Sequence, residues 1–423
     1  MTHVLDELAW RGLLAQTTDL GALREAFDAG PVTYYCGFDP TAPSLHHGHL
    51  VQLLTMRRLQ RAGNKPLALV GGSTGLIGDP RPTAERQLQS KDVVAGWVER
   101  IADQIRPYLD FDGAYGAQLV NNLSWTQPMS AIDFLRDIGK HFSVNRMLAK
   151  DAVSARLESE TGISYTEFSY QLLQALDFLE LNRRYGCTLQ TAGSDQWGNM
   201  TAGLDLLRRA DGVTAHALGT PLLTKADGTK FGKSEGGAIW LDPQLTSPYA
   251  FFQFWLQAED AQVGHYLRVM TDRTPEEIAA LDEATAQRPG AREAQRTLAR
   301  DVTTLVHGAA ECERAEAAAA ALFGRGELAA LPEATLDAAL REVPSVELAP
   351  AETPTFAELF EAAGLVESRS AARRAATEGG LYLNNARITD ALATPGAGDW
   401  LHGRFLVLRR GRQNVAGVRR KIT

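Results

Sequence analysis

The chain has 423 residues, of which 44% are hydrophobic and 22% charged. This length predicts two or three domains, and the composition is that of an ordinary globular protein. No apolar run approaches the ~18 residues of a membrane helix, and the start lacks the pattern of a signal peptide. Cys36, Cys187 and Cys312 are too far apart for a disulfide framework or a zinc motif, so we expect a cytoplasmic protein.

The net charge of −8 argues against a nucleic-acid partner, but its distribution reverses that inference. Residues 355–423 hold eleven Arg or Lys against six Asp or Glu, a net charge of +5, so the first 354 residues carry −13. A basic end of this kind is either a solvated surface or a region that attracts a phosphate backbone. We favour the second interpretation, because the cations gather at one end of the chain.

Short apolar runs alternate with amphipathic stretches through the first half of the chain. This pattern predicts strands at 32–38, 65–72, 118–125 and 187–194, helices at 49–63, 91–109 and 164–186, and one more helix after the last strand. Such alternation is typical of an α/β fold with a doubly wound, Rossmann-like parallel sheet. Ligands bind these sheets beyond the carboxyl ends of the strands, where residues 35–39 and 190–196 are expected.

The second half of the chain has a different pattern. We predict a Rossmann-like domain at 1–246, an α-helical domain at 247–341, a proline-containing linker at 342–354, and a small α+β domain at 355–423. Within the last domain, a helix precedes a second helix that starts at Ser368 and ends near Gly379, and a strand follows.

Three histidines stand close together in "SLHHGHL" at 44–50. They suit a metal site, a helix cap with a structural role, or a seat for a polyphosphate. A metal site would require further closely spaced ligands, which the sequence does not offer. The phosphate interpretation gains from "TKADGTKFGKS" at 224–234, a glycine-containing loop with Lys230 and Lys233. This loop is not a P-loop, which would require glycine where the chain has Asp227.

These two segments resemble known signatures. "HHGH" at 46–49 is similar to the HIGH motif of class I aminoacyl-tRNA synthetases, and "KFGKS" at 230–234 is similar to their KMSKS loop. Longer runs resemble the bacterial tyrosyl-tRNA synthetase family across nearly the whole chain: "YCGFDPTAPSLHHGHL", "GGSTGLIGDP", "FSYQLLQALDF" and "GSDQWGN". The chain departs from that family at His47, which replaces an aliphatic residue, and at Thr191-Ala192, beside the expected tyrosine pocket.

The resemblance implies roles for individual residues. Thr41, His46, His49, Lys230 and Lys233 would be catalytic, donating hydrogen bonds to the phosphates of ATP, whose charge grows in the transition state. Tyrosine would be bound by Tyr35, Asp79, Tyr170, Gln174, Asp177 and Gln196, with Tyr35 and Asp177 on the phenol and Tyr170, Gln174 and Asp79 on the ammonium group. ATP would also contact Cys36, Gly37, Asp39, Gly48, Gly193 and Asp195.

Spacing alone adds one independent argument to these assignments. Tyr170, Gln174 and Asp177 are four and three residues apart, so they share one face of the predicted helix. Three polar groups on one face of an otherwise apolar helix indicate a pocket lining. At Gly48, any side chain is expected to intrude on the nucleotide.

The tail is similar to an RNA-binding module of a small-subunit ribosomal protein, which makes Arg373, Arg374, Arg404, Arg409, Arg410 and Arg412 candidate RNA contacts. The resemblance implies L-tyrosine, ATP and a tRNA for tyrosine as substrates, Mg²⁺ accompanying ATP, no dedicated metal site, no DNA and no membrane partner. It also implies a homodimer, with residues 142–150 near the interface. Three alternatives stay open: a tryptophanyl-tRNA synthetase, a small-molecule adenylyltransferase with a similar His-x-Gly-His turn, and a non-catalytic RNA-binding relative.

Overall fold

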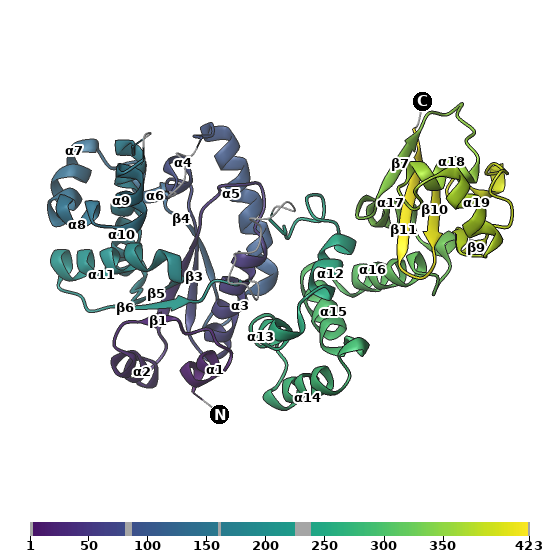
Figure 1. The fold of residues 1–423 in the computed structure, drawn as a ribbon. Coiled ribbons are helices and arrows are strands. Elements are labelled where there is room, and N and C mark those ends of the chain that lie inside the picture. Colours follow the sequence, from purple (N-terminus) through teal and green to yellow (C-terminus); the bar gives the residue numbers. More distant parts are fainter. Residues whose placement is uncertain (1–2, 81–86, 160–161, 225–237, 422–423) are drawn as a thin grey trace. The chain divides into compact units, whose positions relative to one another are not determined.

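The computed structural model describes residues 3–80, 87–159, 162–224 and 238–421. The chain divides into two compact units (Figure 1). The first comprises Met1–Leu241 and Gly264–Ala279, and the second comprises Asp242–Val263 and Ala280–Thr423.

The first unit contains a six-stranded sheet in the order β1-β6-β5-β2-β3-β4. Its strands are β1 (Gln16–Thr17), β2 (Thr33–Phe38), β3 (Lys65–Val70), β4 (Gln118–Asn121), β5 (Leu189–Gly193) and β6 (His216–Thr220). Neighbours from β6 to β4 pair in parallel, which confirms the doubly wound sheet. The short edge strand β1 pairs antiparallel with β6 and had no counterpart in the sequence prediction.

Helices cover both faces of this sheet (Figure 1). The first unit contains α1 (Val4–Trp10), α2 (Leu20–Ala29), α3 (His47–Arg61), α4 (Thr74–Ile77), α5 (Lys91–Ile105), α6 (Leu123–Thr126), α7 (Ala131–Asp133), α8 (Val144–Leu148), α9 (Asp151–Leu157), α10 (Tyr165–Tyr185) and α11 (Trp197–Asp211). Alternation along β2 directs Tyr34 toward α3, where its hydroxyl donates to Met56 O at 2.5 Å. The next residue, Tyr35, packs on Phe178 of α10 at a ring distance of 5.2 Å.

The strand order reverses between β2 and β5. β2, β3 and β4 follow one another in one direction, and β5 and β6 lie on the other side of β2. The loops after β2 and β5 therefore diverge at their carboxyl ends and leave a crevice there. Residues 35–39 and 190–196 meet at this crevice, as predicted.

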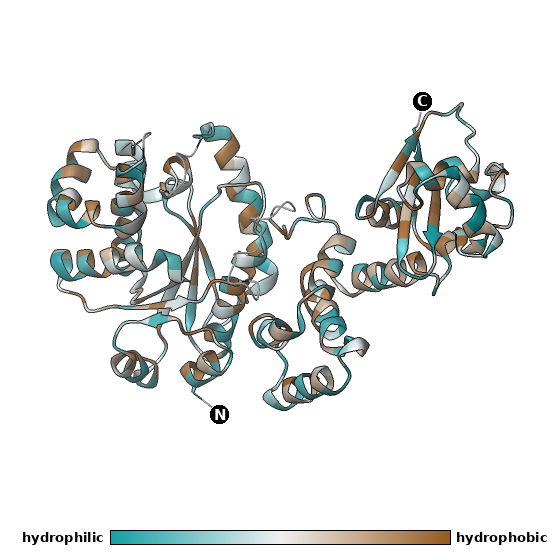
Figure 2. Ribbon diagram, viewed as in Figure 1, coloured by the Kyte–Doolittle hydropathy of each residue, from teal (hydrophilic) through white to brown (hydrophobic). Residues whose placement is uncertain are grey.

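The second unit joins helices to a second sheet. Its helices include α12 (Pro248–Leu256), α15 (Glu293–His307), α16 (Ala309–Leu322), α17 (Glu333–Arg341), α18 (Phe356–Ala362) and α19 (Arg369–Thr377), while α13 (Asp260–Met270) and α14 (Pro275–Gln287) contribute residues to both units. The strands are β7 (Ser345–Leu348), β8 (Leu381–Leu383), β9 (Ala386–Arg387), β10 (Phe405–Arg410) and β11 (Asn414–Arg420), in the order β7-β11-β10-β8-β9. Figure 2 shows apolar residues along β10 and β11, where the core of this sheet lies.

Two predicted segments differ from the structure. The strand expected at 118–125 ends at Asn121, because Asn122 has helical backbone angles and its side chain turns into hydrogen bonds at the end of the sheet. The linker expected at 342–354 contains β7, which pairs in parallel with β11. In β7, apolar Val346 and buried Leu348 alternate with exposed Ser345 and Glu347, which is the pattern of a half-buried strand.

Candidate active site

A pocket of about 370 Å³ opens at the crevice between β2 and β5. It is lined by Tyr35, Cys36, Gly37, Asp39, Thr41, His46, Gly48, His49, Gln52, Leu69, Thr74, Asp79, Tyr170, Gln174, Asp177, Gln190, Ala192, Gly193, Asp195, Gln196 and Leu222. All six side chains predicted to bind tyrosine belong to this lining. So do the residues predicted to bind ATP, except Lys230 and Lys233, which lie outside the described residues.

The two outer histidines of the HHGH segment form the N-terminus of α3. The Nδ1 atom of His46 accepts the N–H of Gly48 at 3.0 Å, and the Nδ1 atom of His49 accepts the N–H of His46 at 3.1 Å. Their rings lie 3.9 Å apart. Burial lowers the pKa of His46 to about 4 and holds that of His49 well below its usual value. Each is therefore a neutral imidazole whose proton is on Nε2, because Nδ1 acts as an acceptor.

Gly48 is constrained by this cap. A Cβ at position 48 would stand 2.9 Å from Cε1 and 3.1 Å from Nδ1 of His46. The sequence predicts that a side chain at position 48 would intrude on the nucleotide. The structure shows a nearer neighbour, the imidazole of His46, which a side chain would displace from its hydrogen bond.

His47 lies outside the pocket lining and is 6% exposed. Its N–H donates to Ile239 O at 3.0 Å, and Leu241 N donates to Leu45 O at 2.8 Å. His46 and Trp240 also form an isolated antiparallel bridge, with their rings 6.0 Å apart. The chain that follows the predicted lysine loop is thus hydrogen-bonded to the start of α3.

Asp177 forms the floor of the pocket. It is 1% exposed, its Oδ2 accepts from Asn122 Nδ2 at 2.9 Å, and its Oδ1 accepts from Trp125 Nε1 at 2.9 Å. Burial raises the pKa of Asp177 to about 8, and the two donated hydrogen bonds oppose that rise. Because both donors come from the end of β4 and from α6, the carboxylate has one fixed orientation.

A second carboxylate connects three elements around the pocket. Asp39 accepts from the hydroxyl of Tyr170 at 2.6 Å and from that of Thr74 at 2.6 Å. The Oγ1 atom of Thr74 in turn accepts from Asn122 at 3.0 Å. A Cβ at Gly71 would stand 2.0 Å from Asp39 Oδ1, so the turn after β3 requires glycine there.

Several polar atoms in the lining have no hydrogen-bond partner among the described residues. They are the hydroxyl of Tyr35 and the Oε1 atoms of Gln52, Gln174 and Gln190, all of them buried. Buried polar atoms are nearly always paired in folded proteins. Four unpaired ones around a single pocket indicate a polar ligand.

Known proteins are similar in sequence to both units. A family model described as "tRNA synthetases class I (W and Y)" matches residues 28–324, and a "Tyrosine--tRNA ligase SYY-like C-terminal domain" matches residues 335–417. The tyrosine–tRNA ligase of Streptomyces coelicolor is 63% identical over 419 residues, covering 99% of both chains, and that of Mycobacterium bovis is 58% identical over 419 residues. The chain belongs to the tyrosine–tRNA ligase family of class I tRNA synthetases.

Solved structures agree with this family. A C-terminally truncated mitochondrial tyrosyl-tRNA synthetase from Aspergillus nidulans superposes with a TM-score of 0.67 at 28% identity, covering 74% of this chain and 92% of that one. A tryptophanyl-tRNA synthetase from Encephalitozoon cuniculi has a TM-score of 0.54 at 13% identity, which reflects the shared fold alone. The resemblance inferred from the sequence is therefore confirmed.

Asn122, Trp125 and Gln190 had no individual role in the sequence prediction, although Gln190 lies within 190–196, the range expected at the crevice. Asn122 and Trp125 orient Asp177, but they lay within a segment predicted as strand. Gln190 lines the pocket from β5. A glutamine inside the apolar run "CTLQTAG", which is otherwise a buried strand, was the available signal. At the departure noted earlier, Ala192 lines the pocket, while buried Thr191 donates to Tyr35 O at 3.4 Å.

The six candidate RNA-binding arginines differ in their accessibility. Arg409 is 8% exposed, and its guanidinium lies 4.1 Å from the ring centre of Tyr382. Arg404 pairs with Glu333 at 2.7 Å, and Arg410 donates to Leu365 O at 2.8 Å. The remaining three, Arg373, Arg374 and Arg412, are exposed, and their side chains form no ion pair with any residue in the described ranges.

The described residues contain no group of three or more His, Cys, Asp or Glu side chains that could hold a metal ion. Within the same part of the chain, every helix is too short or too polar to cross a membrane.

Proposed function

We propose that this chain is a tyrosine–tRNA ligase that works in the cytoplasm on L-tyrosine, ATP with its Mg²⁺, and a tRNA for tyrosine. In the first step, a carboxylate oxygen of tyrosine attacks the α-phosphorus of ATP. The bond from that phosphorus to the bridging oxygen breaks, and pyrophosphate leaves. In the second step, a hydroxyl at the 3′ end of the tRNA attacks the carbonyl carbon of the adenylate, an ester bond forms, and AMP leaves. The observation that carries the proposal is the buried polar floor formed by Asp177 and Tyr35 in the pocket.

This floor suits a phenol. The substrate hydroxyl donates to Asp177, whose orientation is set by Asn122 and Trp125, and the unpaired hydroxyl of Tyr35 completes its hydrogen bonding. Phenylalanine would leave these buried groups unpaired, at a cost of ~1–3 kcal/mol for each group. The floor therefore selects tyrosine by penalising the analogue that lacks the hydroxyl.

The start of α3 suits the phosphates of ATP. His46 and His49 are neutral and direct Nε2–H donors from a rigid cap, so they can stabilise charge that develops on phosphate oxygens without reorganising. Thr41 lines the same side of the pocket. Lys230 and Lys233 are proposed to supply charge to the leaving pyrophosphate. Their loop is followed directly by the segment that is bridged to His46, which supports that role.

For tRNA, we propose Arg373, Arg374 and Arg412 as the phosphate contacts, since these cations are exposed and not engaged within the second unit. Arg404, Arg409 and Arg410 are better described as structural, because their guanidinium groups already have partners in the same unit.

We also propose that the protein forms a homodimer through the helices around residues 131–150. Ile132, Leu135, Val144 and Leu148 have exposed fractions of 69%, 51%, 58% and 37%. Apolar side chains gathered on one stretch of surface indicate a protein interface. Figure 2 shows apolar residues on α7 and α8, the helices that carry this stretch.

Pyrophosphate exchange with each of the twenty amino acids tests the proposal. We expect exchange that depends on tyrosine and is absent with phenylalanine and tryptophan. Exchange with tryptophan alone would instead indicate a tryptophan enzyme. The absence of exchange with every amino acid, in a protein that still binds tRNA, would indicate a non-catalytic relative.

A further inference from the structure

Four polar side chains, of which Asp79 and Gln196 line the tyrosine pocket, form a continuous hydrogen-bonded chain. Lys150 Nζ donates to Asn199 Oδ1 at 3.0 Å. Asn199 Nδ2 donates to Asp79 Oδ1 at 3.1 Å and to Gln196 Oε1 at 3.0 Å. Gln196 Nε2 then donates to Asp79 Oδ2 at 2.9 Å. Both oxygens of the Asp79 carboxylate thus receive an amide N–H.

Lys150 determines which way both amides face. A lysine ammonium group can only donate, so the oxygen of Asn199 must point toward it and the NH₂ group must point toward Asp79 and Gln196. The oxygen of Gln196 then accepts from Asn199, and this leaves the NH₂ group of Gln196 for the second oxygen of Asp79. If Lys150 were absent, Asn199 could flip, and an amide oxygen would face the carboxylate.

Asp79 is the acid assigned above to the α-ammonium group of tyrosine. It lies in a loop after α4, with no helix or strand of its own to hold it. The N–H donors of Asn199 and Gln196 fix the orientation of its carboxylate, which lines the pocket. The network therefore orients a carboxylate that belongs to no helix or strand.

From this arrangement, we propose that Lys150 and Asn199 are positioning residues for recognition of the tyrosine α-ammonium group, acting through the carboxylate of Asp79. The inference rests on the proposed function. It goes beyond that function by assigning a role to two residues that do not line the tyrosine pocket.

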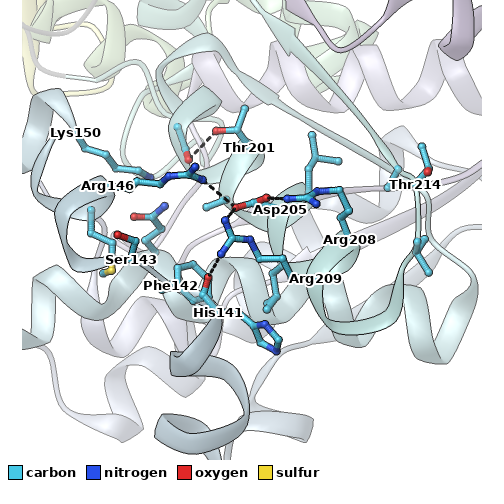
Figure 3. A pocket seen from close by; sticks show the side chains of 18 residues that line it. His141, Phe142, Ser143, Arg146, Lys150, Thr201, Asp205, Arg208, Arg209 and Thr214 are labelled. Atoms are coloured by element: carbon cyan, nitrogen blue, oxygen red, sulfur yellow. Dashed lines mark hydrogen bonds and ion pairs between the residues drawn. The ribbon is translucent and has the colours of Figure 1, made fainter.

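The surroundings of Lys150 support this assignment. Burial lowers the pKa of Lys150 to about 8, and the charge of Asp79 opposes that effect. Lys150 is also at the edge of a second pocket, of about 570 Å³, where Arg146, Arg208 and Arg209 all pair with Asp205 (Figure 3). Lys150 forms no ion pair with that aspartate. Its ammonium group instead points to Asn199, so the partly buried charge acts on the network rather than on the surface cluster.

A purely structural role would predict something different. In that case, Lys150 and Asn199 only connect α11 to the segment before α9. Their loss would then weaken the binding of every ligand of the pocket by the same factor. A positioning role predicts a loss confined to ligands that carry the ammonium group. An analogue without that group separates the two interpretations.

The experiment compares tyrosine with 3-(4-hydroxyphenyl)propionate, which keeps the phenol and carboxylate but lacks the amine. Full-length Asn199→Ala, Lys150→Met and Lys150→Arg are compared with two controls, Thr201→Ala on the same helix and Lys91→Met at the exposed start of α5. We measure the equilibrium Kd for tyrosine and for the analogue, together with the Tm of each variant.

We expect the Kd for tyrosine to rise about tenfold or more in Asn199→Ala and Lys150→Met, while the Kd for the analogue changes less than about twofold. Lys150→Arg keeps a donor and should recover most of the affinity. Equal losses for both ligands, or an unchanged Kd for tyrosine, would overturn the inference. If the wild-type protein binds tyrosine and supports exchange, either failure leaves the proposed function intact. A wild-type protein that does not bind tyrosine would refute both.

Discussion

At the scale of single residues, the site depends on carboxylates whose oxygens already accept hydrogen bonds from the protein when no substrate is bound. Asp177 accepts from Asn122 and Trp125, and Asp39 accepts from Tyr170 and Thr74. Each carboxylate is held by donors from different elements, so its orientation does not depend on one rotamer. Such preorganisation reduces the free energy that substrate binding would otherwise spend on ordering side chains.

The raised pKa of Asp177 predicts how tyrosine binding depends on pH. The phenol donates its proton in the hydrogen bond, so it prefers the ionised carboxylate, and below pH 8 the empty site holds mainly the protonated form. We expect the Kd for tyrosine to rise as the pH falls from 8 to 6, approaching about tenfold per pH unit. Equilibrium binding measured across this range provides the test.

Asp177→Asn made in the Lys150→Met background is the matched control, and its tyrosine affinity should be weaker and independent of pH. Lys150 titrates in the same window with the opposite sign, because protonation favours its hydrogen bond to Asn199. The measurement is therefore repeated in Lys150→Met. A constant Kd in both backgrounds would contradict the pKa of about 8 for Asp177.

Lys233 carries a prediction that rests on the sequence. If the lysine acts mainly on the transition state, Lys233→Ala should slow formation of the adenylate by roughly 10²-fold while the Kd for tyrosine stays unchanged. Rapid mixing with a pyrophosphate assay measures the rate, and Lys91→Ala, at an exposed helix start, is the control. A loss of tyrosine affinity without a slower rate would refute the assignment.

At the scale of elements, the start of α3 combines a helix cap with the phosphate recognition proposed above. His46 is the N-cap residue, and His49 returns a hydrogen bond to the backbone of His46, so the two rings that face the pocket also satisfy donors at the helix end. His47 is buried, and its backbone N–H donates to Ile239 O. The three consecutive roles explain why so many imidazoles occur in this turn.

Burying neutral histidines should make stability depend on pH. Burial lowers the pKa of His47 to about 3, with His46 contributing, while an unfolded histidine titrates near pH 6.5. The stabilisation is therefore fully present above pH 6.5 and is lost as the pH falls toward 3, by up to ~1.4 kcal/mol per pH unit. We expect the Tm of His47→Gln to fall less steeply below pH 6.5 than that of the wild type.

Thermal unfolding between pH 4.5 and 7.5 measures this difference. Any difference in Tm at pH 7.5, where both proteins are neutral at position 47, reports packing alone and serves as the reference. Parallel curves for the two proteins would show that His47 does not titrate on unfolding.

At the scale of the whole molecule, the second unit combines helices and a sheet that the sequence had placed in separate domains. β7 pairs with β11, Arg419 contacts Asp337 of α17, and Asn385 donates to Ala321 O at 2.7 Å. A cut at residue 355 would therefore leave β7 without its partner. A chain ending at residue 324 removes the whole sheet together with α17.

We expect the protein truncated to residues 1–324 to keep tyrosine-dependent pyrophosphate exchange, because every described residue of the pocket precedes position 241. Charging of tRNA should be lost. Exchange measured alongside aminoacylation distinguishes a binding defect from misfolding. Truncated protein that charges tRNA at the full-length rate would show that the basic end has no part in RNA binding.

The three exposed arginines can be tested in the full-length chain. Each phosphate contact contributes ~0.7–0.9 to the slope of log affinity against log salt, so replacing Arg373, Arg374 and Arg412 by alanine should reduce that slope by about 2 to 3. Arg410→Ala, where the guanidinium donates to Leu365 O, is the control and should change the slope less. An unchanged slope in the triple variant would exclude these residues as phosphate contacts.

The sequence by itself determined the doubly wound sheet and the start of α3, because strand and helix periods are set by neighbouring residues. Position at the strand ends predicted residues 35–39 and 190–196 in the crevice, and the family resemblance supplied the other predicted lining residues. Tertiary structure alone decided what Asn122 and Lys150 contact, since their partners are distant in sequence. It also decided which arginines are available to bind RNA. Arg404 and Arg409 have the same side chain and charge as Arg412, but Arg404 pairs with Glu333 and Arg409 lies over the ring of Tyr382. Charge is a property of the residue, whereas its availability depends on the fold.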